Sequence, residues 1–128
     1  MTKNRAEENV NGKDKPYDLE ERTAIFAEAV IALMKKVPVS PVTRRLIDQL
    51  VGASMSVGAN YCEANNASSK KDFRNKIFIC KKEIQETKYW LEMLAEASPE
   101  EKENLKEFWK EAHEITLIFN KIASSLKN

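Results

Sequence analysis

The sequence predicts an all-α protein, an antiparallel up-down-up-down four-helix bundle, and three observations lead to this fold class. The 128 residues include only three Gly and four Pro, too few for the many turns of an all-β fold. Charged residues make up 32% of the chain, which suits long helices with one solvated face. Four segments repeat apolar residues at three-to-four spacing and are joined by short connections, which make successive helices antiparallel.

The predicted domain organisation is a flexible tail over residues 1–16 and a single bundle domain over residues 17–128. The tail is polar, contains an Asn-Gly pair and has no periodicity. It lacks the apolar centre of a signal peptide, and no apolar run in the chain reaches the length of a membrane span. We therefore expect a cytoplasmic protein without membrane contact.

The first two helices are predicted from their caps. Asp18 is the expected N-cap of a helix over about 18–36, with Glu21 placed to complete a capping box, and Pro38 ends the segment. Ser40 followed by Pro41 starts the next helix, because proline is well tolerated in a first turn. This second helix is expected to reach about Asn65.

The third helix, predicted over about 69–97 with a start at Ser69 and Asp72, has the cleanest repeat in the chain. Its core positions are Phe73, Ile77, Cys80, Ile84, Thr87, Leu91 and Leu94. The fourth helix is expected to begin at Ser98, with Pro99 in the first turn and Glu101 in a capping box. The core positions predicted for it are Leu105, Phe108, Ala112, Ile115, Phe119, Ile122 and Leu126.

The sequence offers little chemistry for catalysis. Cys62 and Cys80 both lie in helical patterns, and we expect them to be reduced and buried as small core residues. His113 is the only histidine and is expected at the surface or at the core boundary. There is no nucleophile–base pair, no CxxC motif and no glycine-rich phosphate loop. We expect no catalytic residues, no metal and no cofactor, and hence no enzyme.

The second helix contains an unusual concentration of small residues. A glycine inside a helix costs about 1 kcal/mol relative to alanine, so Gly52 and Gly58 are predicted to let another backbone approach closely. A polar row shares a face with them, and it either meets another helix or subunit or forms a solvated strip. The candidate residues for helix packing or a subunit interface are Gln49, Gly52, Ser56, Gly58, Asn60 and Glu63.

A basic flank on the third helix is the candidate nucleic-acid-binding surface. At about 100° per residue, seven positions fall beside the core stripe. They are Lys71, Arg74, Phe78, Lys81, Lys82, Gln85 and Tyr89. The cations suit phosphates and the two aromatic rings suit unpaired bases. Alternatively, the flank is merely solvated, with the rings widening the core stripe or filling a subunit interface.

Several motifs along the chain resemble one known family. They are Gln49-Leu50, Ser56 to Asn60 with Glu63, Lys71-Asp72-Phe73, Lys82-Glu83, Glu86 and Trp90-Leu91. With them the chain resembles the 23S ribosomal RNA intervening-sequence protein family over nearly its whole ordered length. The resemblance implies an up-down bundle that assembles into a five-membered ring, and most members have no established activity. A related branch comprises basic, nucleic-acid-binding accessory proteins of diversity-generating reverse transcriptases.

Two hypotheses about function follow. The first is a homo-oligomer, pentameric by resemblance, that binds structured RNA or other nucleic acid through the basic flank. The second is a protein–protein interaction scaffold or accessory subunit. Two features would favour it: the formal net charge is only +1, and position 52 is a glycine where many family members carry arginine. The acid-rich first half of the fourth helix is either a solvated face or a partner for the basic flank of a neighbouring subunit.

Overall fold

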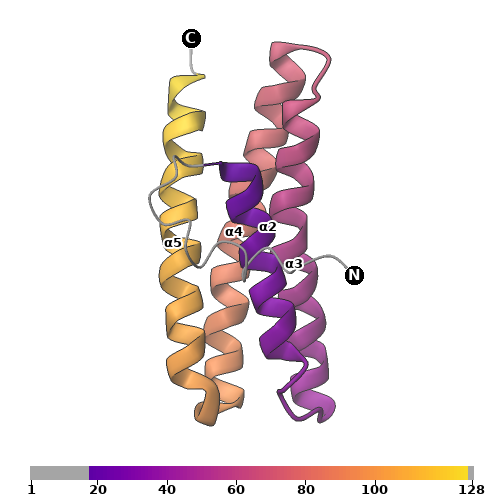
Figure 1. The fold of residues 1–128 in the computed structure, drawn as a ribbon, viewed down its shortest axis with the longest axis vertical. Coiled ribbons are helices and arrows are strands. Elements are labelled where there is room, and N and C mark those ends of the chain that lie inside the picture. Colours follow the sequence, from indigo (N-terminus) through magenta and orange to yellow (C-terminus); the bar gives the residue numbers. More distant parts are fainter. Residues whose placement is uncertain (1–17, 127–128) are drawn as a thin grey trace.

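A computed structural model describes residues 18–126, so the predicted tail lies outside the described residues. The described part is helical throughout apart from its connections and contains no strand. Its elements, shown in Figure 1, are α2 (Leu19–Met34), α3 (Pro41–Asn65), α4 (Lys70–Ala97), the short 3₁₀ helix η2 (Pro99–Glu101) and α5 (Lys102–Ser125). Consecutive helices are antiparallel, and the predicted four-helix bundle is confirmed.

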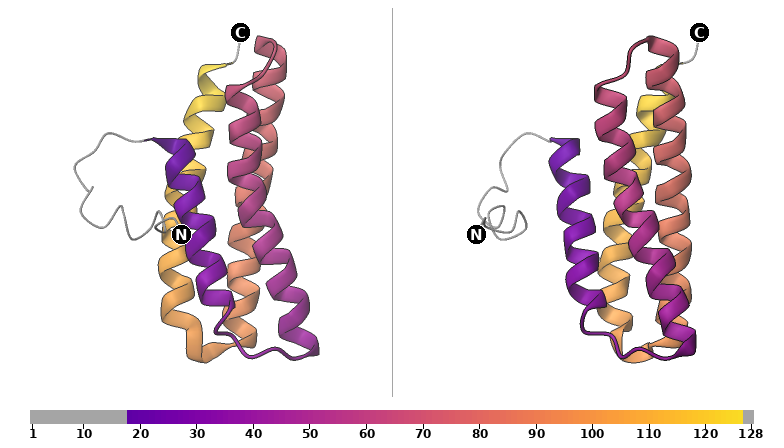
Figure 2. Two further views of the ribbon diagram at one scale, coloured as in Figure 1. Left: turned by 45° about the vertical axis from the view of Figure 1, so that its right-hand side comes forward. Right: turned by 90° about the vertical axis from the view of Figure 1, so that its right-hand side faces the viewer.

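The four helices differ in length, and this shapes the two ends of the bundle. α3 and α4 pair along most of their length, and α5 packs chiefly on α4. α2 has only 16 residues, against 25 in α3 and 28 in α4. Figure 2 shows that the first turn of α2, in indigo, lies well short of the end of the bundle where α3 connects to α4. That end of the bundle therefore consists of α3, α4 and the last turns of α5.

The core follows the predicted stripes. On α4 every predicted position from Ile77 to Leu94 is buried, and Phe73 is partly buried. Two aromatic pairs join α5 to α2 and α3: Phe26 meets Phe108 with ring centroids 6.3 Å apart, and Tyr61 meets Phe119 at 5.7 Å. These edge-to-face contacts tie α2 and α3 to α5 across the interior.

The helix starts largely follow the predicted caps. The Glu21 and Asp72 backbone N–H groups donate to the side chains of Asp18 (3.3 Å) and Ser69 (3.0 Å). A complete capping box occurs at Ser40, where the Thr43 N–H donates to Ser40 Oγ at 3.1 Å and the Ser40 N–H donates to Thr43 Oγ1 at 2.7 Å. The sequence predicted only the first of these two bonds, since threonine is not the usual partner in a capping box.

The capping box predicted at Ser98 was wrong. Ser98 makes no side-chain cap bond; a 3₁₀ turn follows it, and α5 begins at Lys102. The reason is that Ser98 also ends α4, where its N–H donates to the Leu94 carbonyl at 2.8 Å. Its ψ of 72° is short of the extended conformation that an N-cap requires.

One of the two cysteine predictions was also wrong. Cys80 is fully buried, but Cys62 is exposed, and the two form no disulfide within residues 18–126. Cys62 follows the buried Val57 by five residues, which rotates it by about 140° away from the core stripe of α3.

An ion-pair cluster fastens α2 to α5. Arg22 donates to Glu111 through Nε (2.6 Å) and one terminal nitrogen (2.7 Å), and to Glu114 at 2.8 Å. The hydrogen bond to Glu111 raises the pKa of the Arg22 guanidinium, although desolvation opposes the shift. Two of the acidic residues of α5 are therefore used within the subunit.

Candidate nucleic-acid interface

The basic flank of α4 lies at the surface, as predicted. Phe78 and Tyr89 are 46% and 53% exposed, so within the subunit neither ring widens the core stripe, and that alternative is wrong. The ammonium of Lys81 sits 5.6 Å from the centre of the Phe78 ring, a cation–π contact. Lys71 and Lys82 are exposed, and Arg74 and Lys81 are half-buried.

The cations of this flank form no salt bridge within residues 18–126. The salt bridges there involve Arg22, Lys76 and Lys110. Lys71, Arg74, Lys81 and Lys82 take part in none of them. We call these four cations, together with Phe78, Gln85 and Tyr89, the α4 strip.

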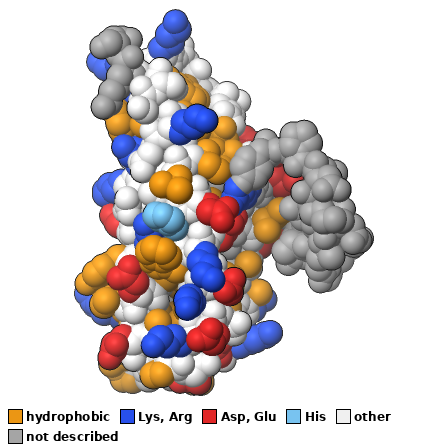
Figure 3. Space-filling model, turned by 90° about the vertical axis from the view of Figure 1, so that its left-hand side faces the viewer, with side chains coloured by type: hydrophobic (Ala, Val, Ile, Leu, Met, Phe, Trp, Pro, Cys, Tyr) orange, Lys and Arg blue, Asp and Glu red, His pale blue; other side chains and the backbone are white. Residues whose placement is uncertain are grey.

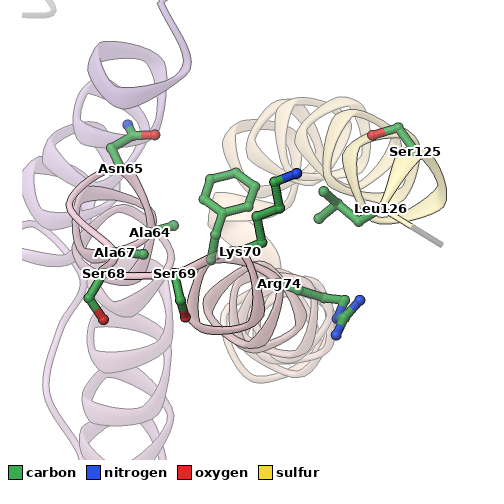
Figure 4. Close-up of a pocket in the computed structure, with 10 residues that line it drawn as sticks. Ala64, Asn65, Ala67, Ser68, Ser69, Lys70, Arg74, Ser125 and Leu126 are labelled. Carbon is green, nitrogen blue, oxygen red and sulfur yellow. The ribbon is translucent and has the colours of Figure 1, made fainter. Parts of the chain in front are cut away.

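A groove continues the α4 strip around the end of the bundle. It has a volume of about 720 Å³ and lies between the α3–α4 connection and the last turn of α5. Figure 4 shows Lys70 and Arg74 extending from α4 toward Ser125 and Leu126. Its remaining lining residues are Ala64, Asn65, Ala67, Ser68, Ser69 and Phe73. None of the ten is acidic, and Arg74 belongs to both the groove and the strip.

Sequence reasoning missed this groove and Lys70 with it. Helical periodicity assigns each residue to a face of its own helix, whereas the groove joins the ends of three helices. A signal was present in "SSKK", where hydroxyl and basic residues meet at a helix start.

The two glycines of α3 have different surroundings. A methyl group placed on Gly58 would lie 3.1 Å from Oγ1 of Thr23, so here α2 does approach α3 closely, as predicted. Around Gly52 nothing lies within 4 Å of such a methyl group. Within the subunit, therefore, only Gly58 serves helix packing.

The polar row of α3 is not buried within the subunit. Gln49 and Glu63 are exposed, and Glu63 pairs with Lys76 of α4 at 2.7 Å. Asn60 and Ser56 are half-buried, and the Asn60 amide donates to the Ser56 carbonyl of its own helix at 2.8 Å. The salt bridge of Glu63 is the polar contact that joins this row to α4, and the exposed part of the row is left for a subunit contact or a solvated strip.

Beside this row, α4 adds side chains that are unusual at a surface. Ile79 is 37% exposed, and Met55 of α3 is 47% exposed. Burial raises the pKa of the Glu83 carboxyl, and the nearby Glu86 raises it further. We call Gly52, Ser56, Ile79 and Glu83 the α3–α4 face; Met55 and Ala59 instead line a groove between α3 and α2.

His113 belongs to a packed cluster between α4 and α5. Its ring stacks on Trp109 at 5.2 Å, and Lys88 Nζ lies 3.0 Å from His113 Nδ1. A lysine ammonium can only donate, so Nδ1 is the acceptor. Lys88 also lies 4.7 Å from the Trp109 ring centre, and Trp109 Nε1 donates to Glu92 at 3.0 Å. Figure 3 shows the histidine, in pale blue, on a face where charged and hydrophobic side chains alternate.

Two features are absent from the described residues. Residues 18–126 contain no group of three or more His, Cys, Asp and Glu side chains that could hold a metal ion. Over the same range, no helix has the length and apolar character required to cross a bilayer.

Comparisons with known proteins agree with the fold. No curated protein matches the chain. One solved structure is similar to this chain, with a TM-score of 0.72 and 29% sequence identity. The match covers 83% of this chain and 98% of the other chain. That protein is one of unknown function from the S23 ribosomal protein family of Bacteroides thetaiotaomicron VPI-5482. The family model described as 23S rRNA-intervening sequence protein matches residues 17–121. The chain therefore belongs to the 23S rRNA-intervening sequence protein family.

Proposed function

We propose that the protein is a non-enzymatic, homo-oligomeric bundle that binds RNA or other nucleic acid through the α4 strip. One observation carries this proposal: four cations that form no salt bridge within residues 18–126 share a flank with two exposed aromatic rings. Solvated lysines alone would not favour this reading, because charge on a helix surface is usually only solubilising. Exposed rings among cations that form no salt bridge match the combination of groups that binds single-stranded nucleic acids.

The net charge of the chain does not oppose the proposal. The formal sum is +1, but binding depends on the charge that faces the phosphates. Eight of the 20 acidic residues lie beyond residue 90, and Glu111 and Glu114 pair with Arg22 rather than with the strip. The α4 strip and the end groove together form a basic surface that turns the corner of the bundle at Arg74.

A binding titration at two salt concentrations tests the proposal. Fluorescently labelled RNA is titrated with the wild type and with Arg74→Glu/Lys81→Glu. The matched control is Lys106→Glu/Lys121→Glu, which reverses two exposed lysines on α5. If each of the four cations contacts a phosphate, the plot of log K against log salt should have a slope of about −3.

The expected result is salt-sensitive binding that is lost in the α4 variant and retained in the α5 control. Equal loss in both variants would mean that binding is unspecific attraction to total charge, which contradicts the assignment to α4. Absence of binding at low salt would reject the nucleic-acid function, and the interaction scaffold, consistent with the net charge of +1, would replace it.

A further inference from the structure

We infer that the α4 strip selects single-stranded over duplex nucleic acid by stacking one unpaired base on Phe78 and another on Tyr89. This inference rests on the proposed function and specifies the class of ligand. It starts from the exposure of the rings: of the seven large hydrophobic side chains that the described part of the chain exposes, these two are the aromatic ones, and both lie on the basic flank.

The two rings are aligned along one line of the helix. They are eleven residues apart within α4, which corresponds to a rotation of about 20° and a rise of about 16 Å. Both are consequently presented to the same ligand on the same side. Two rings on opposite flanks could not receive bases from one strand.

Cationic groups fill the interval between the rings. Lys81 and Lys82 follow Phe78 by about one turn, and the Lys81 ammonium already lies near the Phe78 ring. A base stacked on the free face of that ring would bring its phosphate within reach of both lysines. Gln85 offers an amide for hydrogen bonds before Tyr89 is reached, and unlike the lysines it contributes no charge.

A duplex cannot use these rings. Its bases are stacked on one another and expose only their edges in the grooves, so an aromatic side chain finds no free base face. A duplex would contact the lysines alone, whereas a single strand would gain the stacking as well. The rings are therefore the feature that distinguishes the two ligands.

The spacing also sets a minimum length for the ligand. At about 3.4 Å per nucleotide, 16 Å corresponds to roughly five nucleotide steps of a strand with helical stacking, and fewer if the strand is extended. A trinucleotide with stacked bases reaches one ring only. Affinity should rise steeply once a strand is long enough to occupy both.

The experiment compares a 16-nucleotide oligouridylate with a 16-base-pair RNA duplex in anisotropy titrations at one salt concentration. The variants are Phe78→Leu/Tyr89→Leu, which removes the rings, and Phe78→Tyr/Tyr89→Phe, which keeps them. Leu117→Ala is the matched control, because Leu117 is as exposed as Tyr89, at 53%, but lies on α5. Light scattering and circular dichroism verify the mass and helicity of each variant.

We expect the wild type to bind the single strand at least tenfold more tightly than the duplex, since each stacked base contributes severalfold or more. The leucine variant should lose this preference while still binding the duplex, and the aromatic swap and the Leu117 variant should retain it. Equal affinity of the wild type for both ligands, or unchanged single-strand binding by the leucine variant, would overturn the inference and leave the proposed function standing. A leucine variant of reduced mass would also overturn it, because the rings would then join subunits. Binding of neither ligand by the wild type would refute the proposed function itself.

Discussion

Gly58 shows how one residue determines where two helices meet. The Thr23 hydroxyl that faces it donates within its own helix toward the carbonyls of Leu19 (2.9 Å) and Glu20 (3.0 Å). Thr23 is fully buried and held by these bonds, so it has little freedom to move aside. The cost of a mid-helix glycine is accepted here because even a methyl group would lie 3.1 Å from the Thr23 hydroxyl, so Thr23 would have to shift to admit it.

Replacing Gly58 by leucine should therefore destabilise the subunit by about 1–3 kcal/mol through overpacking. The matched variant Gly52→Ala should instead raise stability by about 0.5–1 kcal/mol, because the site is open and alanine is the better helix former. Urea denaturation followed by circular dichroism measures both. If Gly58→Leu has the same midpoint urea concentration of unfolding as the wild type, the close contact with Thr23 is not important for stability.

Cys80 illustrates a buried group whose ionisation is coupled to folding. It is fully buried, and its Sγ lies 3.6 Å from the Val57 carbonyl oxygen. Burial raises the pKa of the Cys80 thiol from 9.0 to about 12. The folded state therefore keeps the thiol protonated at pH values where the unfolded chain releases the proton.

This coupling predicts an alkaline loss of stability. Because the pKa of the Cys80 thiol is raised on folding, the stability that the protonated thiol contributes is complete below about pH 9. This stability is lost progressively as the pH rises toward 12. At pH 10 the loss assigned to this thiol is about 1 kcal/mol. The difference in unfolding free energy between pH 7 and pH 10 should be smaller in Cys80→Ala than in the wild type, and unchanged in the exposed control Cys62→Ala. Identical pH dependence in all three proteins would contradict the coupling.

At the scale of the elements, the sequence predicted α4 best. Its uninterrupted three-to-four repeat specifies one buried face, and the same angular arithmetic placed Phe78, Lys82 and Tyr89 correctly on the exposed flank. The capping box predicted at Ser98 did not form, because Ser98 both ends α4 and precedes the 3₁₀ turn. A cap motif in the sequence does not reveal this double role. The end groove was beyond prediction because it depends on how far α5 extends beside the α3–α4 connection.

α2 is the element with the fewest means of attachment. It is short, and besides its apolar stripe it is fastened to α5 by Arg22 with Glu111 and Glu114. The Arg22 side chain is 15% exposed and that of Glu111 35%, so solvent screens the pair only in part. This cluster is thus the polar interaction most important for keeping α2 in place.

Removing the charge of Glu111 should loosen α2. Glu111→Gln keeps the shape but weakens the paired hydrogen bonds, and we expect a loss of about 1 kcal/mol in thermal or urea unfolding. Glu107→Gln is the control, because Glu107 is exposed and its carboxylate pairs with Lys110 of its own helix, at 3.4 Å. Hydrogen exchange should also rise in α2 before it rises in α4. Equal stability of the two variants would show that the cluster contributes nothing measurable.

At the scale of the whole molecule, the α3–α4 face is the surface we propose for contact between copies. It combines the exposed Ile79 with small residues, Gly52 among them, that let another helix approach. Gly52→Trp should leave the fold of the subunit intact, because nothing in the subunit lies within 4 Å of the added Cβ, but should lower the assembly mass. Light scattering is the test. The contact is misplaced if the variant keeps the wild-type mass, and the oligomer itself is rejected if the wild type has the 14.7 kDa of one chain.

The same face shows why helical periodicity could not predict which surface would contact a second copy. A helix pattern separates buried from exposed positions, and it cannot distinguish an exposed position that meets water from one that meets a second copy. Gly52 and Gly58 looked equivalent in the sequence, and only the packed subunit separates the glycine that contacts α2 from the one that contacts nothing.

The most direct test of the central claim, binding of nucleic acid by α4, is photo-crosslinking. The wild type is irradiated with 4-thiouridine-labelled single-stranded RNA, and the crosslinked residues are identified by mass spectrometry. We predict crosslinks within residues 71–89, concentrated at Phe78 and Tyr89. Crosslinks confined to α2 or α5, or none at an RNA concentration that saturates binding, would contradict the account.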